Sequence, residues 1–290
     1  MTNANTMRAL VLDDAGGAPL VRRVPVPVPH GGLRSAHVVA AALNPTDMKR
    51  ASRLKPDELP RVLGLEGVVE FSGRLYYANR TVAPHGTFAE ATVVDPGQIF
   101  VLPPHATAEH ALIAGISGLA AWLAIEHVAQ MQAGETVLVF GTTGVVGQTA
   151  AQIARHLGAH RVVGVGRNSD ALDQLVRRGV LDDAVPLDTP SLADDLVELT
   201  EGGASLVIDT LFGARLSSAL RATRLGGRIV TVGADSGVVA RIPFDGLLGR
   251  SLLTHRNSMV SIDTKRQAFE GLVTAITSGS ITLETEECHL

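Results

Sequence analysis

The sequence predicts a two-domain α/β protein, in which an irregular β-rich domain precedes a doubly wound parallel sheet of six strands. Three observations predict this fold. The chain has 290 residues, 46% of them hydrophobic and 19% charged, which is enough to bury a core in each of two domains. All but three of the 14 prolines precede residue 105. After that point, short β-branched runs alternate with helical stretches, as parallel strands joined by helices do.

The first part of the chain consists of short runs of strand formers separated by turn residues. The predicted strands are residues 8–12, 36–41, 67–71, 80–83 and 90–94. Pro25, Pro27 and Pro29 alternate with valines, so this segment is extended and cannot lie in a central strand, because proline has no N–H to donate. We expect this β-rich domain to end near residue 107.

The second part contains six predicted strands with helices between them. The strands are residues 136–140, 161–165, 184–187, 205–209, 228–232 and 251–255. The helices are residues 145–157, 170–178, 192–199, 215–223, a weaker segment at 244–249, and 263–277, which precedes an apolar/polar alternation at 281–285. The apolar stretch 111–125 is shorter than the about 20 residues that span a bilayer, so we expect a buried helix there.

Charge and cysteine content exclude several classes of protein. The net charge is −4 and no long basic run is present, so we expect no nucleic-acid partner, because phosphate binding needs clustered Lys and Arg. Residues 1–6 are polar and lack a signal-peptide core, and we expect a cytoplasmic protein with no membrane partner. The single cysteine, Cys288, excludes an internal disulfide and a cysteine-rich metal site.

A glycine-rich loop is the most specific motif. Gly141, Gly144 and Gly147 follow an apolar strand and open a helix, the order found in dinucleotide-binding (Rossmann) folds. The first glycine allows the tight turn, the second lets the backbone approach a pyrophosphate, and the third lets the helix pack on the sheet. The helix N-terminus offers N–H groups to the phosphates. The predicted cofactor-binding residues of the loop are Gly141, Thr142, Thr143, Gly144, Val145, Val146 and Gly147.

The end of the second predicted parallel strand indicates which dinucleotide binds. An NAD site places Asp or Glu there to accept a hydrogen bond from the ribose hydroxyl, whereas this chain has Gly166, Arg167 and Asn168. A guanidinium suits the additional phosphate of NADPH, although Arg167 is alternatively a solvated surface residue. The sequence therefore favours NADPH over NADH.

Several segments together resemble the medium-chain dehydrogenase/reductase superfamily, and in particular its zinc-independent quinone-oxidoreductase-like branch. The matching segments are residues 7–11, 42–47, 86–90, 134–147, 205–210 and 225–233. The resemblance implies a GroES-like catalytic domain of residues 1–107, to which residues 259–290 return, and a Rossmann domain of residues 108–258. It also implies a substrate cleft between the domains, NADPH as hydride donor, a small-molecule quinone, enone or related activated carbonyl as acceptor, and a homodimer.

The same resemblance argues against zinc. Zinc-dependent members have a cysteine where this chain has Asn44, and a Gly-His-Glu where it has Gly64, Leu65 and Glu66. Zinc needs three or four converging ligands, so no metal is expected. Glu66 is interpreted as a residue hydrogen-bonded in the core.

The resemblance also indicates catalytic candidates. Asn44 and Asp47 match the family's Asn-x-x-Asp near the nicotinamide, although both residue types are equally at home in a turn around Pro45. Tyr76, Tyr77 and His85, in or beside a segment that is shorter than in relatives, are possible proton donors, or else structural residues. Lys49 stands where many relatives have a tyrosine.

Two further groups of residues bear on ligand binding. Leu211, Phe212 and Gly233 follow the fourth and fifth parallel strands, at the edge where such sheets bind ligands, and we expect their backbone groups to hold the nicotinamide amide. A basic run either attracts an anionic substrate or forms a solvated face, and we favour the second interpretation. It comprises Lys49, Arg50, Arg53, Lys55 and Arg61, with Asp57 and Glu58 among them.

The sequence thus predicts an NADPH-dependent, zinc-independent oxidoreductase, in which water or a side chain supplies the proton that accompanies the hydride. The alternative is a non-catalytic NADPH-binding redox sensor or partner protein. The shortened segment and Ala120, which replaces a threonine common in relatives, favour this alternative.

Overall fold

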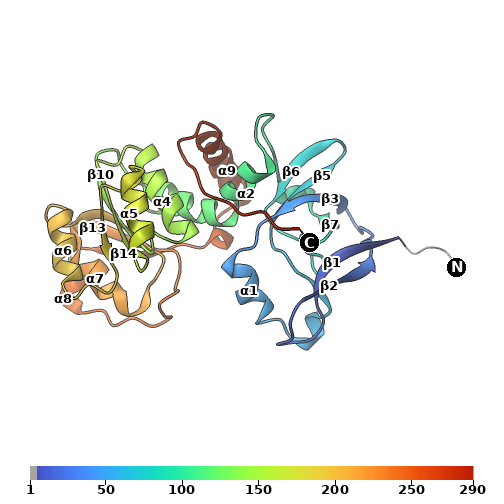
Figure 1. Ribbon diagram of the computed structural model, residues 1–290, viewed down its shortest axis with the longest axis horizontal. Helices are drawn as coiled ribbons and strands as arrows, with labels where there is room; N and C mark the ends of the chain where they lie inside the picture. The colour runs from blue at the N-terminus through green and yellow to red at the C-terminus, as the bar shows by residue number, and fades with distance from the viewer. Residues whose placement is uncertain (1–4, 290) are drawn as a thin grey trace. The chain divides into compact units, whose positions relative to one another are not determined.

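The computed structural model describes residues 5–289, which divide into two compact units (Figure 1). The first unit comprises the described residues up to Ile116 together with residues 284–289, and the second is Ser117–Leu283. The sequence predicts the boundary after residue 107 and a return of residues 259–290 to the first domain. The division instead keeps α9 (Ile262–Thr277) in the second unit, where it packs against α3 (Leu119–Trp122).

The first unit contains two antiparallel sheets. The smaller has the order β2-β1-β4, with β1 (Thr6–Leu12) in the centre, β2 (Leu20–Pro25) and β4 (Arg61–Val62). Pro25 ends the edge strand β2, as expected for a residue without an N–H donor. The larger sheet has the order β7-β3-β5-β6-β8, and its strands are β3 (Arg34–Ala41), β5 (Gly67–Phe71), β6 (Arg74–Ala78), β7 (Ala91–Val94) and β8 (Ile99–Val101).

One predicted strand of this unit is wrong. Residues 80–83 form no strand, and the chain instead pairs earlier, through β6. The reason is a two-residue turn at Ser72 and Gly73, whose φ angles of 52° and 70° suit a tight hairpin. This turn folds β6 directly back onto β5, with Phe71 opposite Arg74.

The second unit is built on a six-stranded parallel sheet, as predicted. The order β11-β10-β9-β12-β13-β14 is that of a doubly wound dinucleotide-binding fold. The strands are β9 (Thr136–Phe140), β10 (Arg161–Gly166), β11 (Asp183–Pro186), β12 (Ala204–Asp209), β13 (Thr223–Thr231) and β14 (Ser251–Thr254). Val137, Leu138 and Val139 of the central strand are fully buried, because helices cover both faces of the sheet.

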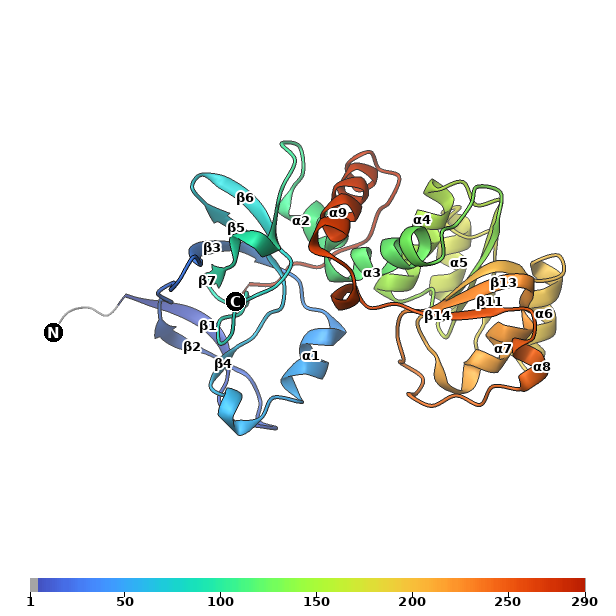
Figure 2. The same cartoon turned by 180° about the vertical axis from the view of Figure 1, so that it is seen from behind.

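The helices of this unit lie within a few residues of their predicted positions. They are α4 (Val145–His156), α5 (Ser169–Arg177), α6 (Leu192–Leu199), α7 (Leu216–Arg221), α8 (Phe244–Leu247) and α9. Figures 1 and 2 show α4 and α5 on one face of the sheet and α6 and α7 on the other. Leu192 and Leu196 of α6 and Leu216 of α7 pack in one buried cluster with the sheet.

The alternation at residues 281–285 forms no strand. Thr282 instead bonds to a side chain of α4: the Gln152 amide donates to its carbonyl and accepts its N–H, both at 2.8 Å. The side-chain amide of Gln152 thus makes the two hydrogen bonds that a neighbouring strand would make. The sequence pattern does not reveal this contact.

The apolar stretch at residues 111–125 is helical but interrupted. It contains α2 (Ala108–Ile113) and α3, with wide π-type turns at Ala114–Gly118 and Leu123–Val128 and a break at Gly115, whose ψ is −142°. Among residues 5–289, one helical stretch, Ala108–Val128, has the length and hydropathy of a membrane span. Of its apolar window, 61% is buried within the structure, and the core helix of a soluble protein meets the same criteria.

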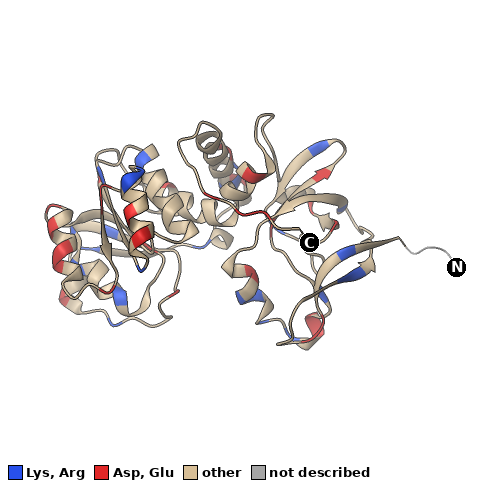
Figure 3. Ribbon diagram, in the orientation of Figure 1, with Lys and Arg blue, Asp and Glu red and all other residues tan. Residues whose placement is uncertain are grey.

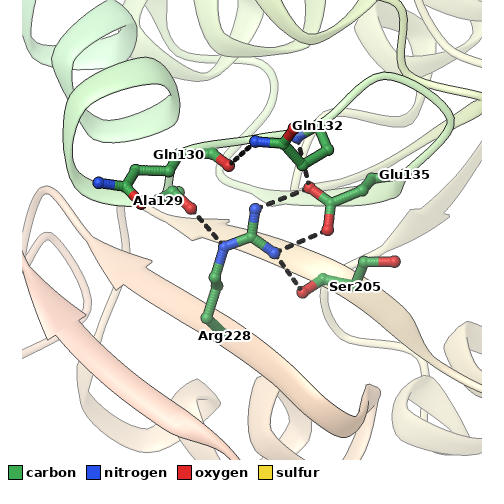
Figure 4. A network of polar contacts seen from close by, with 6 residues as sticks. All are labelled: Ala129, Gln130, Gln132, Glu135, Ser205 and Arg228. Atoms are coloured by element: carbon green, nitrogen blue, oxygen red, sulfur yellow. Dashed lines mark hydrogen bonds and ion pairs between the residues drawn. The ribbon is translucent and has the colours of Figure 1, made fainter.

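An ion pair between Arg228 and Glu135 stabilises the edge of the parallel sheet where β9 and β12 begin. The Arg228 guanidinium contacts both carboxylate oxygens of Glu135, at 2.7 and 2.8 Å, and donates to the carbonyl oxygens of Ala129 and Ser205 (Figure 4). The two side chains are only 18% and 15% exposed. Burial alone would raise the pKa of Glu135, yet its hydrogen bond with Arg228 holds that pKa below its ordinary value. This network is therefore a structural element of the second unit.

Candidate functional site

The glycine loop joins β9 to α4 and contains three glycines with different roles. Gly141 has a φ of 81°, and an added Cβ there would lie 2.1 Å from the Thr210 hydroxyl oxygen. An added Cβ on Gly147 would lie 2.2 Å from the Gly141 carbonyl oxygen. At Gly144 the nearest atom would be that same oxygen at 3.5 Å, an ordinary contact. The packing of the chain thus requires Gly141 and Gly147, whereas approach of a ligand better explains Gly144.

Two residues of the loop are committed to the fold. The N–H groups of Gly141 and Thr142 both donate to the Val165 carbonyl, at 2.8 and 2.9 Å. The Thr142 hydroxyl donates to the Val139 carbonyl at 2.6 Å and accepts the Val165 N–H. These two predicted cofactor residues therefore fasten the loop to β9 and β10, and their N–H groups are already used.

The start of α4 is open to a ligand. Gly144 is its N-cap residue and supplies no side chain, so the first turn receives no side-chain cap. The N–H groups of Val145 and Val146 lie in this first turn, where a helix provides no internal acceptor. They carry the positive end of the helix dipole and suit a phosphate. Thr143 and Val146 are half-buried, while Gly144 and Val145 are exposed.

The end of β10 has the predicted residues in three different roles. An added Cβ on Gly166 would lie 2.8 Å from the Thr143 methyl group, so Gly166 makes room for the loop. Asn168 caps α5 by accepting the Ala171 N–H at 3.1 Å. Arg167 is exposed, and its guanidinium has no hydrogen-bond or ion-pair partner within residues 5–289. Arg167 is therefore the cation at this strand end that is available to a ligand.

The loop after β12 is shaped by Asp209, which the sequence analysis did not single out. Its carboxylate accepts the N–H groups of Leu211 at 2.8 Å and Phe212 at 3.0 Å. These two donors are therefore unavailable to a nicotinamide amide. The Leu211 carbonyl also accepts the Ser236 N–H at 2.8 Å, so the Phe212 carbonyl is the backbone group that remains at these two positions of the described chain. Phe212 has a φ of 54°, a conformation that side-chain-bearing residues rarely adopt. Gly233, after β13, has no room for a side chain, because an added Cβ would lie 2.5 Å from the Thr210 carbonyl oxygen.

In the first unit, Asn44 and Asp47 form the start of α1 (Pro45–Ala51). The Asp47 carboxylate accepts the N–H groups of Asn44 at 2.9 Å and Leu65 at 3.0 Å. Burial raises the pKa of Asp47, and these two hydrogen bonds oppose the rise. Both predicted catalytic residues are buried. They stabilise the turn at the start of α1, which is the alternative role that the sequence analysis gives for them.

Glu66 is the centre of a buried polar cluster, as its interpretation as a core residue predicted. Asn44 Nδ2 donates to Glu66 Oε1 at 2.6 Å, and the Ile116 N–H donates to Oε2 at 2.7 Å. The Tyr77 hydroxyl donates to the same Oε2. An added Cβ on Gly115 would lie 2.1 Å from this oxygen, so the break in the apolar helix accommodates the carboxyl group. Burial raises the pKa of Glu66 to about 7, despite these three donors.

The three possible proton donors lie in different surroundings. Tyr77 is fully buried, its hydroxyl is bonded to Glu66, and burial raises its pKa well above the ordinary value. Tyr76 is stacked on Phe71, with ring centroids 4.4 Å apart. Burial and the charge of Arg61 lower the pKa of His85, which favours the neutral imidazole. The three side chains therefore have different neighbours: Glu66 for Tyr77, Phe71 for Tyr76 and the charge of Arg61 for His85.

The stability of the protein should depend on pH through Glu66. Its pKa rises from an ordinary 4.5 to about 7 on folding, so the folded state binds the proton more tightly. This contribution is complete below pH 4.5, declines as the pH rises, and is lost above about 7. Urea unfolding of the wild type and Glu66→Gln across this range should show their difference in unfolding free energy fall by roughly 3 kcal/mol.

The Glu66→Gln variant is a suitable reference, because its amide has a similar shape and does not titrate in this pH range. All other titrating groups are common to both proteins, so their effects cancel in the difference. A difference that stays constant between pH 4.5 and 7 would show that folding leaves the proton affinity of Glu66 unchanged.

The residues at the positions of the family's zinc ligands do not fit a zinc ion. Asn44 Nδ2 points its donor at Glu66, Leu65 has no ligating atom, and the Glu66 carboxylate already accepts three hydrogen bonds. Within residues 5–289, no three His, Cys, Asp or Glu side chains come together in a group that could hold a metal.

Comparisons with known proteins agree with this architecture. Residues 145–278 match the family model described as "Zinc-binding dehydrogenase". The quinone oxidoreductase of Lama guanicoe is 25% identical over 292 residues, covering 96% of this chain and 87% of the relative. A quinone oxidoreductase of Thermus thermophilus, whose structure was also solved with NADPH, is 28% identical with a TM-score of 0.73, covering 95% of this chain and 86% of that one.

The chain also resembles part of a much larger enzyme. It is 28% identical over 245 residues to a phenolphthiocerol/phthiocerol polyketide synthase subunit of Mycobacterium tuberculosis, covering 81% of this chain but only 11% of that protein. The matches to quinone oxidoreductases extend over most of both chains, and the fold agrees with theirs. This chain therefore belongs to the medium-chain dehydrogenase/reductase superfamily, as an oxidoreductase of the quinone-oxidoreductase-like kind.

Proposed function

We propose that this protein is an NADPH-dependent, zinc-independent reductase that transfers a hydride to a quinone, an enone or a related activated carbonyl. The observation that carries the proposal is the loop at Gly144. No contact of the described chain forbids a side chain there, and the helix that follows begins without a cap. A pyrophosphate that approaches the backbone explains both features.

The residues of the second unit fit the parts of the cofactor. Thr143, Val145 and Val146 would bind the pyrophosphate through N–H groups, and Arg167 would bind the 2′-phosphate. The carbonyl oxygen of Phe212 would accept a hydrogen bond from the carboxamide, because Asp209 takes the N–H groups of Leu211 and Phe212 and the Leu211 carbonyl accepts the Ser236 N–H. When bound, the cofactor supplies the hydride; the protein supplies positioning.

In the first unit, Asn44 and Asp47 would hold the substrate side of the site in shape. Glu66 fixes the Asn44 amide, and Asp47 fixes the backbone of Asn44 and Leu65. Tyr77 is not a suitable proton donor, since its hydroxyl is already committed to Glu66. We therefore assign the proton that accompanies the hydride to water, Tyr76 or His85. No step is assigned to zinc, because the residues at the ligand positions do not fit it.

The alternative function is that of an NADPH-binding redox sensor or partner protein without turnover. The use of the Tyr77 hydroxyl and of both Asp47 oxygens within the fold favours it, because these groups are then not free to act on a substrate. Steady-state consumption of NADPH with a panel of quinones and enones separates the two functions. We expect turnover with at least one acceptor; binding of NADPH without consumption across the panel would favour the sensor.

Replacing Arg167 should change the choice of cofactor. A charge-assisted hydrogen bond contributes about 1.5–3 kcal/mol, or roughly 10- to 150-fold in affinity. Arg167→Ala should weaken NADPH binding by this factor and leave NADH binding nearly unchanged, as measured by fluorescence titration. Added salt should reduce the preference of the wild type, because an exposed pair is screened. Equal losses for both cofactors would make Arg167 a structural residue.

We further propose a cytoplasmic homodimer. β14 is an edge strand of the parallel sheet, so one side of its backbone is available to pair with another chain. A second copy of this chain would extend the sheet there. Analytical ultracentrifugation should give twice the mass of 30.3 kDa, whereas a monomer would contradict this proposal.

A further inference from the structure

Arg61 is a buried cation without a partner. It lies in β4, opposite Leu12 of β1, and it is only 8% exposed. Within residues 5–289, its guanidinium makes no hydrogen bond or ion pair. Buried arginines are almost always paired, because an isolated charge is costly to remove from water. None of its nitrogens is among the fully buried, unpartnered side-chain atoms of the described chain, so the guanidinium still reaches solvent and is accessible to an anion.

Arg61 lines a small cavity in the first unit. The other side chains that matter there are Arg50 and Asp47, and the rest of the wall includes Leu54, Gly64 and Leu65. The cavity measures about 20 Å³, which is room for little more than one water-sized group. It therefore suits the head group of a ligand, rather than a ring.

The charges around this cavity leave a positive site. Burial and the nearby charge of Arg50 lower the pKa of Arg61, and Arg61 in turn lowers the pKa of His85. Glu58 lies close enough to raise the pKa of Arg61 but forms no ion pair with it. Figure 3 shows Lys and Arg on α1 and on the chain that follows it.

The carboxylate of Asp47 also lines the cavity, but its oxygens are occupied. One accepts the Leu65 N–H at 3.0 Å and the other accepts the Asn44 N–H at 2.9 Å. Asp47 forms no ion pair with Arg61 within the described residues. Two arginines and one aspartate therefore line the cavity, which leaves a net positive charge.

We propose that the Arg61 cavity binds the carboxylate of the substrate, so that the preferred acceptor is an enone or related carbonyl compound that carries a carboxylate group. This inference rests on the proposed function. A guanidinium binds a carboxylate through two parallel hydrogen bonds, and the size of the cavity favours a planar carboxylate over a phosphate. Asp47 lines the cavity and also accepts the Asn44 N–H. A bound carboxylate would therefore lie next to Asn44 and Asp47, the residues assigned to the substrate side.

The test compares two substrates that share the same enone, acetylacrylate and its methyl ester. The carboxyl group is charged in the acid, whereas in the ester it is neutral and one methyl group larger. With NADPH, the wild type should have a KM about 10- to 150-fold lower for the acid than for the ester, the range of a charge-assisted pair. Arg61→Met should remove this difference by raising the KM of the acid alone. Arg61→Lys, which keeps the charge without the paired donors, should fall between the two.

Arg53→Met is the matched control, because Arg53 is an exposed arginine of the same basic run. It should leave the KM of both substrates unchanged. An unchanged KM for the methyl ester and an unchanged thermal midpoint of unfolding would show that the Arg61→Met protein is folded. If either changes, Arg61→Lys is the variant to compare with the wild type. Equal KM values for acid and ester in the wild type, or equal effects of Arg61→Met on both, would overturn the proposal.

Direct binding separates this proposal from the proposed function. If neither compound is reduced, calorimetric titration with acetylacrylate still measures the affinity of the cavity for a carboxylate. Binding by the wild type that is at least about 10-fold weaker in Arg61→Met supports the carboxylate site even without turnover, since one decade corresponds to 1.4 kcal/mol. Equal binding by both proteins, or none by the wild type, contradicts it.

Discussion

Gly144→Val should weaken NADPH binding roughly 100-fold while the protein remains folded. The backbone at Gly144 has φ −86° and ψ 162°, an extended conformation that valine adopts readily. An added Cβ meets only an ordinary contact with the Gly141 oxygen, at 3.5 Å. The branched side chain would instead occupy the space of the pyrophosphate. Loss of two N–H to phosphate bonds, at about 1.5 kcal/mol each, weakens binding roughly 100-fold, which fluorescence titration would detect.

The neighbouring Gly147→Ala is the contrasting control. Its Cβ would lie 2.2 Å from the Gly141 carbonyl oxygen, so this smaller change should lower the thermal midpoint of unfolding. Gly144→Val should leave that midpoint close to the wild-type value. If Gly144→Val bound NADPH with unchanged affinity, or if it unfolded as Gly147→Ala does, the assignment of the loop would be wrong.

Arg228→Met should be the most destabilising of the side-chain changes considered. It removes both contacts with Glu135 and leaves a carboxylate that is only 15% exposed without its cation. Breaking a buried pair from one side costs about 3–5 kcal/mol, and the residual exposure of this pair places the expected loss near the lower end. Urea unfolding followed by circular dichroism measures this loss.

The double variant Arg228→Met with Glu135→Leu tests the cause of the loss. Removing both charges also removes the unpaired carboxylate, so the double variant should recover much of the stability. The expected coupling between the two positions exceeds about 1 kcal/mol. Additive losses would show that the two side chains act independently and that the network of Figure 4 is not the source of stability.

The parallel sheet was predictable because its determinants are local. Its strands are β-branched runs that are buried on both faces, and its loop needs small residues at fixed spacing. The hairpin at Ser72 and Gly73 has an equally local signal in its glycine, but the prediction of a strand at residues 80–83 takes no account of it and omits β6. The Gln152 contact with Thr282 joins distant positions and has no signal in the sequence pattern.

The candidate site was predictable only in part. The glycine loop was placed from its motif, but Asp209 emerges as the residue that orders the adjacent loop only once the chain is folded. Glu66 was correctly interpreted as a core residue, although its partners Tyr77 and Ile116 are brought to it by the fold. Arg61 belongs to the basic run for which the sequence analysis favours a solvated face. It is buried because β4, in which it lies, pairs with the distant strand β1.

The central claim is that the protein moves a hydride from NADPH to carbon, and isotope transfer tests it most directly. NADPH that carries deuterium at the reactive face of nicotinamide C4 would be incubated with the protein and an enone, and the product analysed by mass spectrometry and NMR. The account predicts a product with one deuterium at the carbon that accepts the hydride, formed in proportion to the NADPH consumed. Tight binding of NADPH to the wild type, with no labelled product from any enone tested and no NADPH consumed with any quinone tested, would contradict it and leave the sensor as the better function.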